Sequence, residues 1–154
     1  MSGSEPPQEP APEPAQASFD PRRFMSYVRR VGHGGALGID YVAHGADWAE
    51  LSLPYDEKLI GMPESGVIAS GPIISLMDMA TSIAIWVKLD RFRHQATLDL
   101  RVDYLRPAQA GRTLIGRGEC YGVTRSIAFV RGVAHDGDAA DPVAHVTGTF
   151  MFTD

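Results

Sequence analysis

Residues Ser70–Val87 read SGPIISLMDMATSIAIWV, and this stretch decides the fold. Ser70 is a suitable N-cap, and Pro72 falls in the first turn of a helix, where a missing amide hydrogen costs little. The residues that follow are apolar around the whole circumference, which predicts a helix buried on every face. Its one charged residue is Asp78. A buried carboxylate is costly unless it has a partner, so Asp78 is the first candidate site residue.

The segments around this helix predict a first short helix and several strands. Asp20-Pro21 is a helix start, and Gly32 and Gly34-Gly35 are expected to end that helix. Apolar alternation predicts two strands before the long helix and four after it, within residues 37–53, 98–104, 114–123, 127–135 and 143–152. Pro54–Ser65 is predicted to be a loop. Strands joined by short turns form an antiparallel meander, so the fold class is α+β, with an antiparallel sheet wrapped around one long buried helix.

The strand that follows the long helix is predicted to have one core face and one polar face. Leu98, Leu100, Val102 and Tyr104 alternate with polar residues, and the four apolar side chains are assigned to the core.

Composition fits a single domain. The chain has 154 residues, of which 44% are hydrophobic and 21% charged, and its net charge is -5. Residues 22–154 are almost neutral, which argues against a nucleic-acid partner because duplex binding needs a basic face. The single cysteine, Cys120, excludes an intrachain disulfide and fits a reducing, cytoplasmic location. Asp78 and Gly71-Pro72 interrupt the apolar run of residues 66–87, so no membrane span is expected.

The first residues differ from the rest of the chain. Residues 1–19 form a Pro/Glu/Ala-rich segment that cannot bury enough apolar surface to order itself, so we predict a disordered tail. Residues 20–154 are predicted to form one domain with an N-terminal helix.

Three motifs carry a resemblance to a known family. They are Gly66–Gly71 followed by Leu76-Met77-Asp78-Met79-Ala80, then Tyr104-Leu105-Arg106-Pro107-Ala108, then Gly148-Thr149-Phe150. In this order they resemble the hotdog superfamily, and more closely its acyl-CoA thioesterases of the phenylacetate-pathway type. The resemblance covers about residues 36–152. Three positions depart from it: Ala69 and Ser70 replace the His and the first Gly of a His-Gly-Gly triplet, and Pro63 replaces an Asn.

The resemblance implies hydrolysis of acyl-CoA thioesters to free acid and CoA. The thioester carbonyl would lie at the N-terminus of the long helix, where the first amides have no partner and the dipole favours negative charge. The amides of Ser70 and Gly71 would hold the oxyanion, and Asp78 would serve as base or nucleophile across a dimer interface. Thr97 would orient the water, and Glu64 is expected as a substitute polar group at the mouth of the site.

The same resemblance implies how CoA and the oligomer are arranged. Arg106, Arg125 and Ser126 are expected to bind the phosphates of CoA. No metal or organic cofactor is expected, and neither a nucleic acid nor a membrane is expected as a partner. By analogy we expect a homodimer or homotetramer with active sites at the subunit interface.

Two alternatives stay open. One is a hotdog protein that binds acyl-CoA or another small ligand without hydrolysing it, which Ala69 and Pro63 favour because they remove two polar groups. The other is a hydratase or dehydratase acting on acyl thioesters. Such an enzyme usually needs a histidine near the acid, and none lies near Asp78 in the sequence segment around it.

Overall fold

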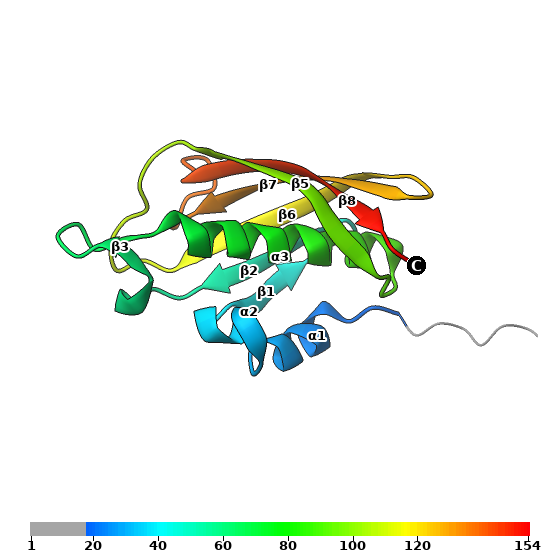
Figure 1. Cartoon of the computed structure of the whole chain (residues 1–154), viewed down its shortest axis with the longest axis horizontal. Helices are drawn as coiled ribbons and strands as arrows, with labels where there is room; N and C mark the ends of the chain where they lie inside the picture. The colour runs from blue at the N-terminus through cyan, green and yellow to red at the C-terminus, as the bar shows by residue number, and fades with distance from the viewer. Residues whose placement is uncertain (1–17) are drawn as a thin grey trace, which may run out of the picture.

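The computed structural model describes residues 18–154 and shows one curved sheet around a central helix (Figure 1). Except for Ser18 and Phe19, the predicted tail lies outside the described residues. The elements follow in the order α1 Pro21–Val28, α2 Gly32–Leu37, β1 Asp40–His44, β2 Trp48–Leu53, a 3-10 turn Glu57–Leu59, β3 Ile60–Met62, β4 Val67–Ile68, α3 Ser70–Leu89, β5 Gln95–Tyr104, β6 Leu114–Val123, β7 Ile127–His135 and β8 Ala144–Phe152.

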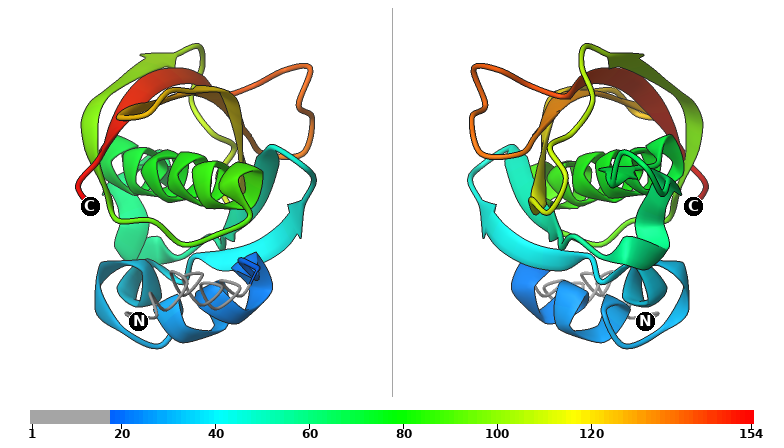
Figure 2. Two further views of the ribbon diagram at one scale, coloured as in Figure 1. Left: turned by 90° about the vertical axis from the view of Figure 1, so that its right-hand side faces the viewer. Right: turned by 90° about the vertical axis from the view of Figure 1, so that its left-hand side faces the viewer.

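The antiparallel sheet wraps around α3, as predicted. Its strand order is β1-β2-β6-β7-β8-β5, and a separate two-stranded sheet is formed by β3 and β4. In the end-on views of Figure 2 the strands curl around the axis of α3. Strands β6, β7 and β8 form the predicted meander. Strand β5 does not join it next to β6, because the chain crosses over after Tyr104 and leaves β5 at the far edge beside β8.

Close packing of α3 depends on glycine in β6. A Cβ atom on Gly118 would lie 2.6 Å from the backbone nitrogen of Thr81 and 2.7 Å from the carbonyl oxygen of Ala80. Because real Cβ atoms do not approach backbone so closely, only glycine lets the middle of the helix touch the sheet here. This contact fixes the depth of the helix turn that carries Asp78.

Four local predictions were wrong. Ala69, not Ser70, is the N-cap of α3, and Ser70 is its first helical residue. Gly32 does not end the helical region. It adopts a left-handed φ of +62° and begins the short helix α2, which takes in Leu37. The predicted loop Pro54–Ser65 contains β3.

The fourth error concerns the core face of β5. The pairing of β5 with β8 shifts register between Thr97 and Asp99. A bulge of this kind interrupts the strict alternation of side chains, since one extra residue is inserted into the strand. Leu98, which lies at the bulge, is therefore 55% exposed, whereas Leu100 and Val102 pack against the core. Tyr104, at the end of the strand, is 46% exposed.

Helix α3 is long and apolar enough to cross a membrane by length and composition, the only such helix among residues 18–154. In this fold half of that apolar window is buried inside the protein. The sheet that covers α3 thus accounts in part for its apolar composition.

Candidate functional site

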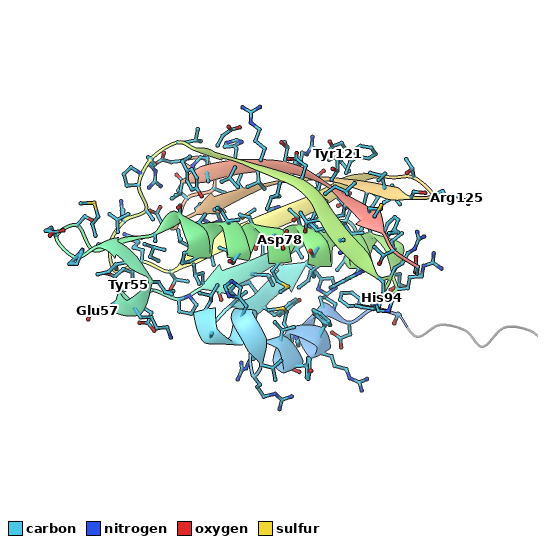
Figure 3. The ribbon with its side chains drawn as sticks, viewed as in Figure 1. Tyr55, Glu57, Asp78, His94, Tyr121 and Arg125 are labelled. Carbon is cyan, nitrogen blue, oxygen red and sulfur yellow. The ribbon has the colours of Figure 1, made fainter. Side chains whose placement is uncertain are left out.

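One face of α3 is left uncovered by the sheet. The residues on it, three or four positions apart, include Gly71, Ile74, Ser75 and Asp78, and Ile74 is 42% exposed. The prediction of a helix buried on every face is therefore wrong for this face. Asp78 itself lies near the middle of α3 and is half-buried, not fully buried (Figure 3).

The carboxylate of Asp78 is held by the strand at the sheet edge. The Thr97 hydroxyl on β5 donates a 2.8 Å hydrogen bond to Asp78 Oδ1. Since this bond uses one carboxylate oxygen, Oδ2 can accept from a second donor such as a water molecule. The structure thus brings together two predicted site residues that are 19 positions apart in sequence.

The N-terminus of α3 offers amide donors with no side-chain cap. Ala69 has no side-chain oxygen, and no side chain caps this helix. The first amides of a helix have no acceptor within it, so those of Ser70 and Gly71 are available to a ligand. Both residues are exposed, and a Cβ on Gly71 would meet nothing within 4 Å. The Tyr104 hydroxyl donates to the Ser70 carbonyl at 3.4 Å, which ties β5 to this turn.

A pocket opens beside this helix end. Its volume is about 360 Å³, and it is lined mainly by apolar side chains, among them Val67, Ile73, Leu105 and Val143. Ser70 and Arg106 also line it. An apolar hollow next to unpaired amides suits a ligand that combines a carbonyl with a hydrocarbon chain.

The structure places Arg106 in an ion pair rather than at a free anion site. Its guanidinium donates to both oxygens of Asp136, at 2.9 and 2.7 Å, and it contacts the Asp141 carboxylate at 3.1 Å. The Asp136 hydrogen bonds raise the pKa of Arg106, and those from Arg106 hold the pKa of Asp136 well below its usual range. Arg106 therefore joins the loop after β5 to the loop after β7, with its charge already matched.

Arg125 and Ser126 lie at the opposite end of α3, in the exposed turn between β6 and β7 (Figure 3). A pocket at this end is lined by Arg91, Arg93 and Arg125 together with Thr124. Arg93 is paired with Asp154 at 2.7 Å. The predicted phosphate ligands Arg106 and Arg125 are thus not brought together within one chain.

Glu64 is exposed in the turn between β3 and β4. Within residues 18–154 its side chain has neither a hydrogen bond nor an ion pair. The same part of the chain contains no group of three or more His, Cys, Asp or Glu side chains placed to hold a metal ion.

Sequence reasoning missed a histidine on the open face of α3. His33 on α2 lies with its Nε2 2.8 Å from the Ser75 hydroxyl, one helical turn before Asp78. The Ser75 hydroxyl also lies 3.2 Å from the Gly71 carbonyl, to which it can donate, so Ser75 connects His33 to the first turn of α3. The sequence signal for this histidine was its place in the run Gly32-His33-Gly34-Gly35, where glycines allow close packing. A Cβ on Gly34 would lie 2.9 Å from the Val28 side chain, which marks a tightly packed turn rather than a helix end.

A six-stranded antiparallel sheet curved around a helix, with a carboxylate and free amides on the open helix face, defines a hotdog-fold protein with a candidate active site. The Thioesterase superfamily is the family whose model matches residues 65–143, and the chain belongs to it.

The chain is also similar to individual proteins. The chain is 26% identical over 146 residues to the medium/long-chain acyl-CoA thioesterase YigI of Escherichia coli, covering 81% of this chain and 88% of that protein. It is 32% identical over 76 residues to a putative esterase of Haemophilus influenzae, covering 49% of this chain and about half, 54%, of that relative. A solved structure from Pseudomonas aeruginosa is 42% identical, with a TM-score of 0.74, and covers 84% of this chain and 94% of its own.

Proposed function

We propose that this protein hydrolyses acyl-CoA thioesters and that two copies of the chain form each active site. The proposal rests chiefly on the carboxylate of Asp78, which Thr97 holds on the open face of a helix with an uncapped N-terminus. Family membership and the E. coli relative named as an acyl-CoA thioesterase support it. The finer resemblance to the phenylacetate-pathway type stays a prediction.

Hydrolysis needs a group that activates water and donors that hold the developing oxyanion. The thioester carbonyl oxygen accepts from the amides of Ser70 and Gly71. Water adds to the carbonyl carbon while one of its protons passes to the Asp78 carboxylate. The carbon–sulfur bond then breaks, the sulfur keeps the electron pair, and the thiolate of CoA takes the proton back from Asp78, which leaves the free acid and an ionised Asp78.

The distance between these groups requires a second copy of the chain. Ser70 and Gly71 lie seven to eight residues before Asp78, or about 11 Å along a helix that rises about 1.5 Å per residue. An attacking water has to lie about 3 Å from both the base and the carbonyl carbon. Asp78 cannot therefore serve the amides of its own helix. Two antiparallel helices related by a twofold axis would bring Asp78 of one copy close to Ser70 of the other.

The surfaces around this face suit such a pairing. Strand β5 pairs with β8 on one side, and its other edge lies open at the end of the sheet. Leu98 on this strand and Ile74 on α3 are both exposed. Ile74 is midway between Ser70 and Asp78, so it would lie at the twofold axis. A homodimer is accordingly part of the proposal, and pairing of two dimers into a tetramer is expected by analogy.

In this dimer Arg125 is the better phosphate ligand. It lies near the C-terminal end of α3 (Figure 3). That end, at Leu89, is about 16 Å along the helix from Asp78. An extended pantetheine arm would lead from the thioester to this end, where Arg125 and Ser126 meet the phosphates. Arg106 would instead shape the pocket beside Ser70, because its charge is used by Asp136.

The direct test is thiol release from a panel of acyl-CoA substrates by the wild-type protein and by Asp78→Asn. The substitution keeps the size of the side chain and removes its basicity, so kcat should fall by about 10²–10⁴. Asp99→Asn is the matched control, because Asp99 is an exposed carboxylate on the same strand as Thr97. Full activity in Asp78→Asn would refute the role of Asp78. Tight acyl-CoA binding without turnover by the wild-type protein would instead favour a binding protein.

A further inference from the structure

An aromatic groove lies on α1, where the described part of the chain begins. It is lined by Ser18, Phe19, Asp20, Arg23, Phe24, Tyr27 and Phe92 and has a volume of about 400 Å³. Tyr27 is 61% exposed and Phe92 is 49% exposed. We call this set the α1 groove.

The floor of the α1 groove is rigid. The Trp86 ring lies 5.5 Å from Phe19, 5.1 Å from Phe24 and 4.8 Å from Phe92, measured between centroids. The Trp86 indole donates to the Arg93 carbonyl at 2.7 Å, and Trp86 itself is buried. The aromatic walls are thus already in place without any ligand, so little ordering is needed when one binds.

Two charged side chains line the groove, Arg23 and Asp20. The Asp20 carboxylate accepts from the Arg23 backbone amide at 3.1 Å and caps α1. Arg23 lines the groove, and its guanidinium has no acidic partner within residues 18–154. A ligand with an apolar face and a carboxylate would match both the rings and this charge.

The sequence next to the groove has that composition. Residues 5–14 read EPPQEPAPEP, and only residues 15–17 separate them from Ser18, which lines the groove. A polyproline II helix has three residues per turn, so in such a helix Pro7, Pro10 and Glu13 would share one face. Aromatic grooves bind such proline faces, because the ligand is extended and loses little entropy. Glu13 on the same face would then reach Arg23.

We propose that residues 5–14 bind in the α1 groove of their own chain, with Pro7 and Pro10 on the aromatic rings and Glu13 paired with Arg23. Residues 15–17 are the connection between this segment and Ser18. A short connection of this kind gives an effective concentration in the millimolar range, so a weak contact is enough to fill the groove. The proposal does not depend on the thioesterase activity.

A spin label tests this arrangement in the full chain. Cys120→Ser removes the single native cysteine, Ala11→Cys adds one for the label, and the broadening of Tyr27 and Phe92 signals is measured by NMR. Arg23→Glu should reduce this broadening at least about threefold, and Glu13→Arg combined with Arg23→Glu should restore it. Retained broadening in Arg23→Glu would overturn the ion pair on which the proposal depends.

Proline pairs supply the matched control. Pro7→Ala with Pro10→Ala should reduce the broadening, whereas Pro6→Ala with Pro12→Ala should not, because those two prolines lie on a different face. Equal effects of the two pairs would mean that residue 11 lies near the groove only because it is tethered there. In a second experiment, isotope-enriched chains without a spin label are mixed with spin-labelled chains of natural isotope content. Broadening of the Tyr27 and Phe92 signals in this mixture would contradict binding within the same chain and assign the groove to a second copy.

Discussion

Replacing Thr97 by valine removes one hydroxyl and almost no volume, so it tests what that hydroxyl does to Asp78. The bond to be lost is the 2.8 Å donation to Asp78 Oδ1. A hydrogen bond to a charged group contributes about 1.5–3 kcal/mol, and every 1.36 kcal/mol of barrier is a factor of ten in rate. The full range corresponds to a loss of about ten- to 150-fold. Thr97 is exposed, so solvent weakens the bond and the lower half of this range is expected.

The assay is thiol release at saturating acyl-CoA, with kcat and KM determined separately. Because Thr97 orients the carboxylate and does not contact CoA in the proposed site, kcat should fall while KM changes little. Thr97→Ser keeps the hydroxyl and should retain most of the activity. Equal losses in Thr97→Ser and Thr97→Val would refute the reasoning, since the methyl group and not the hydroxyl would then be the important feature.

Three further predictions concern the fold. Gly118→Ala forces a Cβ against the backbone of α3 and should lower the stability by about 1–3 kcal/mol, or the Tm by roughly 2–12 °C. The control is Gly122→Ala on the same strand, whose Cβ would meet only the Phe129 ring at 3.5 Å. Equal melting curves of the two variants by circular dichroism would contradict this prediction. Arg106 lowers the pKa of Asp136, so the pair stabilises the fold above the unfolded aspartate pKa of about 3.9 and the contribution is lost as the pH falls below it. Urea unfolding of Asp136→Asn should show lower stability at pH 7 and a smaller loss between pH 5 and 2 than the wild type. Burial raises the pKa of the Cys120 thiol, so a thiol reagent at pH 8 should label it only after unfolding, and rapid labelling of the native protein would count against its buried position.

The fold could be predicted from sequence because its main signals are local. The apolar stretch of α3 is continuous, and the strands β6, β7 and β8 alternate over nine or ten residues between recognisable turns. Helix α2 was missed because glycine usually ends a helix, and here Gly34 is needed for close packing against Val28. The bulge in β5 was missed because a register shift depends on the partner strand and leaves no mark in the hydropathy of the strand itself.

The site was only partly predictable, since its contacts join distant segments. Asp78 was identified as the one charge of an apolar helix and Thr97 through the resemblance, and only the structure shows that they share a hydrogen bond. Arg106 was expected to bind the phosphates, but its guanidinium is paired with the carboxylate of Asp136, 30 residues further on. His33 reaches Ser75 across 42 residues. Such pairs follow from tertiary packing, which the pattern of one segment does not encode.

The most informative error is the prediction that α3 is buried on every face, because one face is open. An apolar sequence indicates that a helix is buried, but it does not indicate whether the same chain or a second copy of the chain buries it. The exposed Ile74, the exposed Leu98 and the open edge of β5 are three apparent defects of the isolated chain. The separation of Asp78 from the amides of Ser70 and Gly71 is a fourth, because a base about 11 Å along the helix cannot act on a carbonyl held there. One twofold pairing of helices and edge strands would remove all four, so the same apolar residues that misled the burial prediction are those expected to assemble the active site.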